Sequence, residues 1–354
     1  MFEQALLAMA SVATDPYLLF LIFATTILGV IIGVLPGLGA TTGAALLLPF
    51  TLTMDPVHAI AVLATIYVSA TFAGSITAIL INTPGTSAAA ATTFDGYPLA
   101  QKGEAGRALG VAVISSTVGG VFSVIVLCFA APLLARVAYE FRSPEYFALT
   151  VFGLSMLASI SAGGAVKNLI GGIFGVWLST IGAERVTGIE RFMFGNYELY
   201  EGLHFVPIFI GLFAISELLV QSKTVNKIVN TVSMKAVKLP TKEDYKKIWK
   251  TILRSCGIGT FIGVLPAEGA TVASMIGYSE ARRWSKNKEE FGKGSIEGIA
   301  GAEAANNSAT GGAMVPTMVL GIPGSGTTAI ILVGLMVHGL RPGVYLFTEQ
   351  VEKV

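Results

Sequence analysis

Long apolar stretches most constrain what this chain can fold into. About nine of them divide its 354 residues, and the longest, 57–81 and 109–134, exceed the roughly 20 residues that a helix needs to cross a bilayer. The other stretches are 17–35, 146–161, 165–183, 205–220, 252–265, 299–320 and 327–340. Only 13% of the residues are charged, which is too few to cover a soluble protein of this size. We therefore expect an all-α polytopic membrane protein.

The distribution of charge predicts an orientation in the membrane. No Lys or Arg precedes Lys102, whereas lysines gather between residues 222 and 250. Because cytoplasmic loops are rich in Lys and Arg, we expect 222–250 to be a cytoplasmic loop and the N-terminus to lie outside. The lysines either fix the topology alone or also bind anionic lipid. A net charge of +1 argues against a nucleic-acid partner.

An internal repeat is the most informative feature for function. The sequence GVLPGLGAT at 33–41 recurs as GVLPAEGAT at 263–271. A second pair follows in the same order, since SAT at 69–71 and PGT at 84–86 recur as SAT at 308–310 and PGS at 323–325. Two ordered matches at nearly equal spacing indicate a duplicated chain.

The two copies are expected to lie upside-down relative to each other. The first copy follows an external N-terminus, and the second follows the cytoplasmic lysines. We divide the chain into a first transmembrane repeat with its following helices (1–221), the Lys-rich loop (222–250) and an incomplete second repeat (251–354). Inverted repeats are typical of secondary transporters, whose site lies where the repeats meet. A channel or a lipid-handling protein is the alternative.

Pro and Gly interrupt each copy twice, which predicts broken helices. A broken helix at membrane depth exposes backbone N–H groups, and a half-helix N-terminus attracts a carboxylate. Small hydroxyl and amide side chains surround the breaks. We expect a substrate site formed by Gly37, Gly39, Thr41, Thr42, Asn82, Thr83, Gly85, Thr86, Ser87, Asn306, Asn307, Ser308, Gly324, Ser325, Gly326 and Thr327. The alternative is that these small residues only allow close helix packing.

A coupling ion is expected at the second copy of the first motif. Glu268 stands where the first copy has Leu38, and Gly269 and Thr271 follow it. Glu268 either holds a cation or faces cytoplasmic water. One helical turn before Asn306, Glu303 shares its polar face. No nucleotide-binding P-loop occurs in the sequence, so we expect no cofactor and a gradient of Na⁺ or H⁺ as the driving force.

The motifs together resemble a known family, the large permease subunit (TctA) of the tripartite tricarboxylate transporters. The residues that carry this resemblance are 33–39, 46–51, 82–86, 95–99, 102–108, 303–308 and 321–326. The resemblance implies a multi-pass symporter subunit of the bacterial inner membrane. It also implies a small membrane subunit and a periplasmic solute-binding protein as partners, and a tricarboxylate or related organic acid as substrate.

The sequence departs from the family pattern in two places and ends early. Glu184 and Arg185 stand where members commonly have Asp-Pro, and Met193 stands where Thr is usual. These departures bear on the exact substrate more than on its class. Family members continue through several more helices after a motif like that at 339–343, so we expect a chain truncated at its C-terminus.

Overall fold

The computed structural model describes residues 12–156, 165–184, 187–216, 219–220, 238–265, 269–343 and 346–347. Across these residues helices dominate, and one short antiparallel pair, β1 (Gly182–Ala183) and β2 (Glu190–Arg191), is the extent of sheet. Three segments are long and apolar enough to cross a membrane: Pro16–Val34, Pro56–Ile81 and Ser87–Tyr139. The expectation of an all-α polytopic membrane protein is confirmed.

The first copy of the repeat forms a helical hairpin and then a broken helix. The hairpin turns back at the Pro36 motif, and the second break falls at Asn82. Its elements are α2 (Pro16–Val34), α3 (Ala40–Thr51), α4 (Pro56–Ile81), the 3₁₀ turn η1 (Ser87–Ala89) and α5 (Ala90–Leu99). A π-helical turn, η2 (Ala100–Glu104), leads into the long α6 (Ala105–Tyr139).

The second copy repeats this order of elements. Its hairpin and broken helix are α11 (Lys242–Val264), α12 (Gly269–Trp284), α13 (Ile296–Leu320) and α14 (Gly326–Val337), with the 3₁₀ turn η6 (Lys288–Glu290) between α12 and α13. Between the copies lie α7 (Ser143–Met156), α8 (Ala165–Ser179), β1, β2, η4 (Tyr197–Leu199), α9 (Phe205–Phe209) and the π-helical η5 (Ile210–Ile215).

The helices of the two copies end with the same local geometry. After α2 the N–H of Leu35 donates to the carbonyl of Ile32, and after α11 the N–H of Leu265 donates to the carbonyl of Ile262. Similarly, α4 and α13 both end in a left-handed residue, Asn82 (φ 56°) and Gly321 (φ 69°). Asn and Gly are the residues that adopt this conformation most readily.

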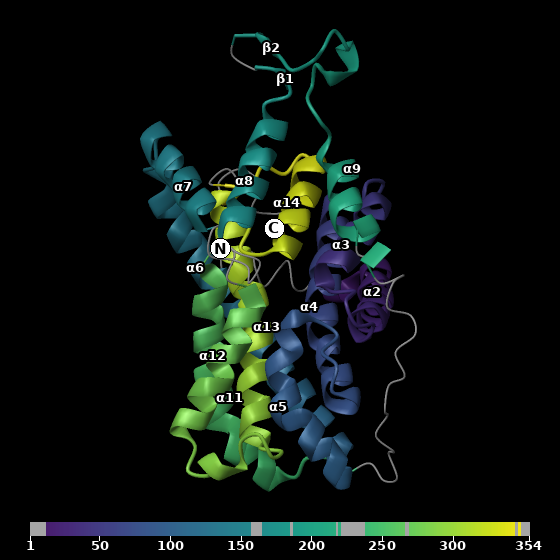
Figure 1. Cartoon of the computed structure of the whole chain (residues 1–354), viewed down its shortest axis with the longest axis vertical. Coiled ribbons are helices and arrows are strands. Elements are labelled where there is room, and N and C mark those ends of the chain that lie inside the picture. Colours follow the sequence, from purple (N-terminus) through teal and green to yellow (C-terminus); the bar gives the residue numbers. More distant parts are fainter. Residues whose placement is uncertain are drawn as a thin grey trace.

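The equivalent helices α4 and α13 run in opposite directions. Near the start of α4, Leu63 and Ile66 share a buried cluster with Met314 and Met318, which lie near the end of α13. At the other end of α4, Ile79 shares a cluster with Ile296 and Ile299 at the start of α13. Consistently, α5 lies towards the lower end of the bundle in Figure 1 and α14 towards the upper end. This antiparallel relation is the one that an inverted repeat requires.

Glycines bring the helices of each copy into close contact. A Cβ atom placed on Gly33 would lie 2.3 Å from the carbonyl oxygen of Ala70, and one on Gly263 would lie 2.4 Å from that of Ala309. These four residues are equivalent positions of the repeat. Close packing by small residues is therefore present here, at glycines one turn before each hairpin tip.

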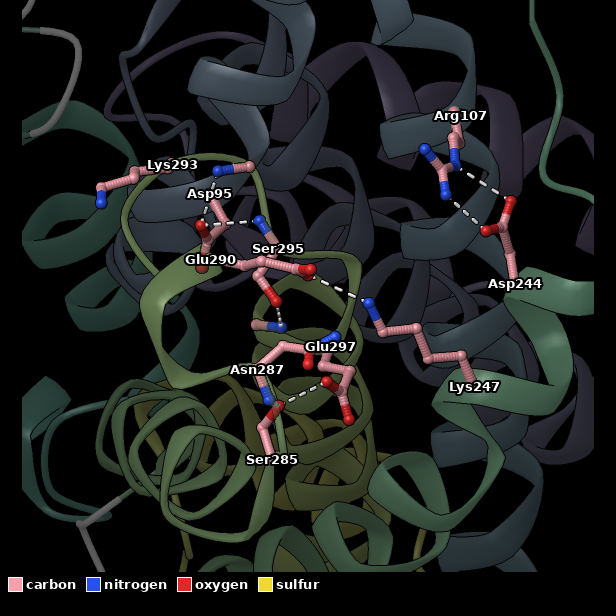
Figure 2. A network of polar contacts seen from close by, with 12 residues as sticks. Asp95, Arg107, Asp244, Lys247, Ser285, Asn287, Glu290, Lys293, Ser295 and Glu297 are labelled. Carbon is pink, nitrogen blue, oxygen red and sulfur yellow. Dashed lines mark hydrogen bonds and ion pairs between the residues drawn. The ribbon is translucent and has the colours of Figure 1, made fainter.

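A polar network joins the copies near the starts of α11 and α13 (Figure 2). From α5, the Asp95 carboxylate accepts hydrogen bonds of 2.8 Å from the backbone N–H groups of Gly294 and Ser295, which precede α13. Arg107 near the start of α6 forms an ion pair with Asp244 near the start of α11. The network fixes the start of the second copy against the end of the first.

The last part of the predicted loop 222–250 is helical, and its cytoplasmic placement stays a prediction. Residues 242–250 belong to α11, because Thr241 and Asp244 form a capping box that starts the helix before the apolar stretch. Four of the lysines therefore lie on the first turns of a helix, and residues 222–237 lie outside the part of the chain that is described. The apolar stretch 165–183 is helical only as far as Ser179, and its last two residues form β1.

Two adjacent glycines of α6 test the packing of the copies. A Cβ atom on Gly119 would lie 2.5 Å from the carbonyl oxygen of Ala304 in α13, whereas nothing lies within 4 Å of one on Gly120. We expect Gly119→Ala to destabilise the protein by about 1–3 kcal/mol through overpacking. The matched Gly120→Ala should be neutral or stabilising by up to about 1 kcal/mol. Thermal unfolding in detergent measures both, and equal shifts would contradict the packing of α6 on α13.

Candidate functional site

Hydrogen bonds between backbone groups hold the two breaks of the first copy together. The N–H of Gly37 at the hairpin tip donates to the carbonyl of Gly85 in the second break, at 3.3 Å. In turn, the N–H of Gly85 donates to the carbonyl of Gly74 on α4, at 3.1 Å. A Cβ atom on Gly85 would lie 2.1 Å from the carbonyl oxygen of Gly33. A residue larger than glycine would separate the two breaks.

Hydroxyl groups join the breaks of one copy to those of the other. The Oγ1 atoms of Thr41 and Thr327 lie 2.9 Å apart, so the start of α3 meets the start of α14. The Oγ of Ser87 and the Oγ1 of Thr271 also lie 2.9 Å apart, so the start of η1 meets the start of α12. Thr41 and Thr271 hold the same position in the two copies. The structure thus brings together residues from all four predicted motifs.

The helix starts at the breaks differ in their capping. Gly39 precedes α3 and Thr86 precedes η1, and neither helix start has a side-chain cap. The first-turn N–H groups of α3 have no partner within the helix, so they can donate to an anion. In η1 the N–H of Ala89 donates to the carbonyl of Thr86 at 3.1 Å, which leaves the N–H groups of Ser87 and Ala88 for an anion. The starts of α2, α4, α11 and α13, by contrast, are capped by the side chains of Asp15, Asp55, Thr241 and Ser295. The starts of α9 and η6, away from the breaks, also lack a side-chain cap, so α3 and η1 are distinguished by their place at the breaks and not by the missing cap alone.

The cap of α2 illustrates what an occupied helix start does to a carboxylate. Asp15 accepts hydrogen bonds from the N–H groups of Leu18 and Tyr17, at 3.1 and 2.9 Å, and lies 3.1 Å from the Nε2 of His58. The hydrogen bonds from Leu18 and Tyr17, with His58 beside them, lower the pKa of Asp15 below its usual value. A substrate carboxylate at an open helix start would be stabilised in the same way.

The start of α14 is occupied by its own residues. Ser325 and Thr328 form a reciprocal capping box, and the Tyr67 hydroxyl of α4 lies 3.2 Å from the Ser325 hydroxyl. Gly324 packs against the backbone of Ala313, while Gly326 lies beside Thr41. We infer that α14 contributes side-chain hydroxyl groups to this site, and not free backbone N–H groups.

The remaining residues predicted from the first copy have varied surroundings. Thr42 is buried in the first turn of α3, and the exposed Asn82 terminates α4. The Thr83 hydroxyl donates to the carbonyl of Ile81 at 3.3 Å. The buried Oγ1 of Thr86 has no partner among the described residues and packs against Gly74. None of the four motifs contains Lys or Arg, so positive potential here comes from the backbone.

The structure separates one predicted group from the breaks. Asn306, Asn307 and Ser308 lie inside α13, and no described hydrogen bond links them to a break. Beside them lies the carboxylate of Glu303, which accepts hydrogen bonds from the hydroxyls of Thr92 on α5 and Ser116 on α6. Thr92 and Ser116 were not predicted from the sequence, because neither lies near a repeated motif.

Of the three residues predicted to hold a coupling ion, two are described. Gly269 has a left-handed backbone (φ 58°) and begins α12, and Thr271 contacts Ser87 as above. Glu268 lies outside the described residues. The role of all three remains a prediction.

The hydroxyl pairs provide a test of the contact between the copies. We expect the double variant Thr41→Val with Thr327→Val to be less destabilised than the sum of the single variants, with a coupling of about 0.5–1.5 kcal/mol for a part-buried hydrogen bond. The more exposed pair, Ser87→Ala with Thr271→Val, should couple less strongly. Thermal unfolding of the single and double variants measures both couplings, and a zero value for the first pair would contradict the contact.

Comparisons with known proteins agree with the repeat and its motifs. The family model described as "Tripartite tricarboxylate transporter TctA family" matches residues 19–354. The chain is 42% identical over 330 residues to an uncharacterized 52.8 kDa protein in the TAR-I ttuC' 3' region of Agrobacterium vitis, a match that covers 93% of this chain and 65% of that protein. It is also 42% identical over 92 residues to an uncharacterized protein in the TAR-II ttuC' 3' region of the same organism, which covers 26% of this chain and 38% of that protein.

The chain thus spans less than two thirds of the length of these curated relatives. No solved structure matches it. The match of the family model extends over nearly the whole chain and includes all four breaks. The chain belongs to the TctA family of the tripartite tricarboxylate transporters.

Proposed function

We propose that the chain is the permease part of a secondary transporter that imports a tricarboxylate or a related organic acid. The observation that carries this proposal is the meeting of two uncapped helix starts, α3 and η1, with the helix starts of the opposite copy. Backbone N–H groups and hydroxyls at one place suit a carboxylate, which needs donors and a positive potential. Family membership supports the same class of protein.

Transport would follow from movement of one copy against the other. The carboxylate would bind between the first-turn N–H groups of α3 and η1, with the Thr41 and Thr327 hydroxyls beside it. Because the copies contact each other through side-chain hydroxyls at this place, separating them would open the site to one side of the membrane. The driving force in this proposal is a gradient of Na⁺ or H⁺.

The distribution of charge supports an orientation in the bacterial inner membrane. Basic residues gather at the end of the bundle where α6, α11 and α13 begin. They include Arg107 and Lys247 (Figure 2) and also Lys102, whose ammonium group donates to the carbonyl of Lys293. The starts of α2 and α4, at the other end, carry Asp15 and Asp55. By the positive-inside rule we assign the basic end to the cytoplasm. The opposite end would then receive the acid from a periplasmic binding protein, with a small membrane subunit as the third component.

Uptake into proteoliposomes tests the proposed function. The full-length permease would be reconstituted with its small partner, with and without the binding protein, under an imposed Na⁺ or H⁺ gradient. We expect saturable accumulation of labelled citrate or another carboxylate that requires both the gradient and the binding protein. Flux that ignores both would indicate a channel, and absence of flux for a broad carboxylate panel would favour a lipid-handling protein.

A substitution at the open start of α3 tests where the carboxylate binds. Gly39 has an extended backbone (φ −83°, ψ −178°), and the nearest atom to a Cβ placed on it is 4.0 Å away. We expect Gly39→Asp to cap α3 with its own carboxylate and to lower uptake at least about tenfold. The matched Gly39→Ala adds the Cβ without a cap and should retain uptake within about threefold. Equal uptake by the two variants would exclude α3 as the binding element.

A further inference from the structure

A buried carboxylate lies away from the helix breaks and joins the two copies. Glu303 on α13 is 0% exposed, and each of its two oxygens meets a hydroxyl from the first half of the chain. The Thr92 hydroxyl on α5 donates to Oε1, and the Ser116 hydroxyl on α6 donates to Oε2 at 2.9 Å. The Ser75 hydroxyl on α4 also faces this carboxylate. Three helices of the first half thus surround one acidic group of the second copy.

No positive side chain among the described residues compensates this carboxylate. The nearby charged groups have other partners, since Asp95 accepts from Gly294 and Ser295, and Arg107 pairs with Glu104 and Asp244. On α11, the titratable groups of the same region are the thiol of Cys256 and the phenol of the partly buried Tyr245. An ionised carboxylate in apolar surroundings is strongly unfavourable without a compensating charge. Glu303 therefore needs a cation, either a proton on the carboxylate or a metal ion beside it.

Unpartnered amides lie within one turn of Glu303 on the same helix. Asn306 and Asn307 are 0% and 1% exposed, and neither their nitrogen nor their oxygen atoms have a hydrogen-bond partner among the described residues. Asn307 lies one turn after Glu303, on the same face of α13. Amide, hydroxyl and carboxylate oxygens are the ligands that a hard cation prefers.

A cavity borders this group of residues. Its volume is about 480 Å³, and it lies between α2, α4 and α6. Its polar lining includes Ser69, Ser116, Thr117 and Asn307. Ser116 links the cavity to Glu303, because this residue lines the cavity and its hydroxyl donates to the carboxylate.

We propose that Glu303, with Thr92, Ser116 and Asn307, holds the monovalent cation, H⁺ or Na⁺, that is coupled to uptake. This inference rests on the proposed function and assigns its coupling ion to a place outside the repeated motifs. Binding of the cation neutralises Glu303 and stabilises the contact between α13 and the helices α5 and α6. Release leaves an uncompensated charge at that contact, so the occupancy of Glu303 biases the position of one copy against the other.

Transport by Glu303→Gln tests the inference. The variant keeps the shape of the side chain and removes its charge, so we expect it to lose gradient-driven accumulation and to retain exchange of labelled for unlabelled carboxylate. The matched control is Glu297→Gln, on the same helix but only partly buried and bonded to Ser285. It should accumulate substrate as the native protein does. Accumulation by Glu303→Gln at the native level would overturn the inference.

A second variant keeps the test decisive if Glu303→Gln fails to fold or loses exchange as well. Thr92→Val with Ser116→Ala retains the carboxylate and removes its two hydroxyl partners. We expect the half-saturating concentration of the driving ion to change at least about tenfold, as for the loss of a hydrogen bond to a charged group. An unchanged value would overturn the inference.

The identity of the ion follows from two further measurements. A protonated Glu303 would give an infrared carbonyl band that titrates with pH and is absent from Glu303→Gln, whereas a sodium site would give binding of radioactive Na⁺ that is lost in the same variant. If uptake by the native protein depends on an ion gradient but the protein shows neither the infrared band nor Na⁺ binding, the inference is overturned. If the native protein shows no gradient dependence at all, the proposed function fails first, and the two failures are thus distinguished.

Discussion

A chain inside a membrane can leave the helix only where other groups satisfy its backbone, and the rest of this structure depends on how that is done. The hairpin tip of the first copy hydrogen-bonds to the second break through Gly37 and Gly85, and Gly85 bonds back to α4 at Gly74. The second copy uses a side chain instead, since the N–H of Gly324 donates to the Thr317 hydroxyl. These bonds satisfy the irregular backbone from within each copy. They leave the first turns of α3 and η1 facing the opposite copy.

The two copies would then divide the work of a transporter between two kinds of site. Where the helices break, backbone N–H groups and neutral hydroxyls suit an anion. Because no Lys or Arg lies in these motifs, no ion pair with a motif side chain has to break when the anion leaves. Inside α13, a single acidic group surrounded by hydroxyls suits a cation. Both sites lie at contacts between the first half of the chain and the second copy, through Thr41–Thr327 in one case and Thr92–Glu303 in the other. Movement between the copies would therefore affect both ligands together.

Much of the fold could be predicted because the signals are local. Apolar length predicted α2, α4 and α6 closely, and the Pro-Gly motifs predicted the breaks at Asn82 and Gly321. The start of α11 was missed, although Thr241 and Asp244 have the spacing of a capping box. The open start of α3 also has a local signal, because Gly39 offers no side-chain oxygen. The surroundings of Glu303 could not be predicted, since Thr92 and Ser116 lie about 190–210 residues away in the chain and meet it only through packing.

We propose that an organic acid binds where the helix starts of the two copies meet. Protection of an introduced cysteine from a hydrophilic maleimide tests it most directly, in full-length permease whose Cys128 and Cys256 have been replaced by serine. Ser87→Cys lies at the exposed start of η1, and Ser279→Cys on α12 serves as a control away from the breaks. We expect the transported acid to slow labelling at position 87 and to leave labelling at position 279 unchanged. Labelling at position 87 that is indifferent to the acid, with uptake intact, would contradict it.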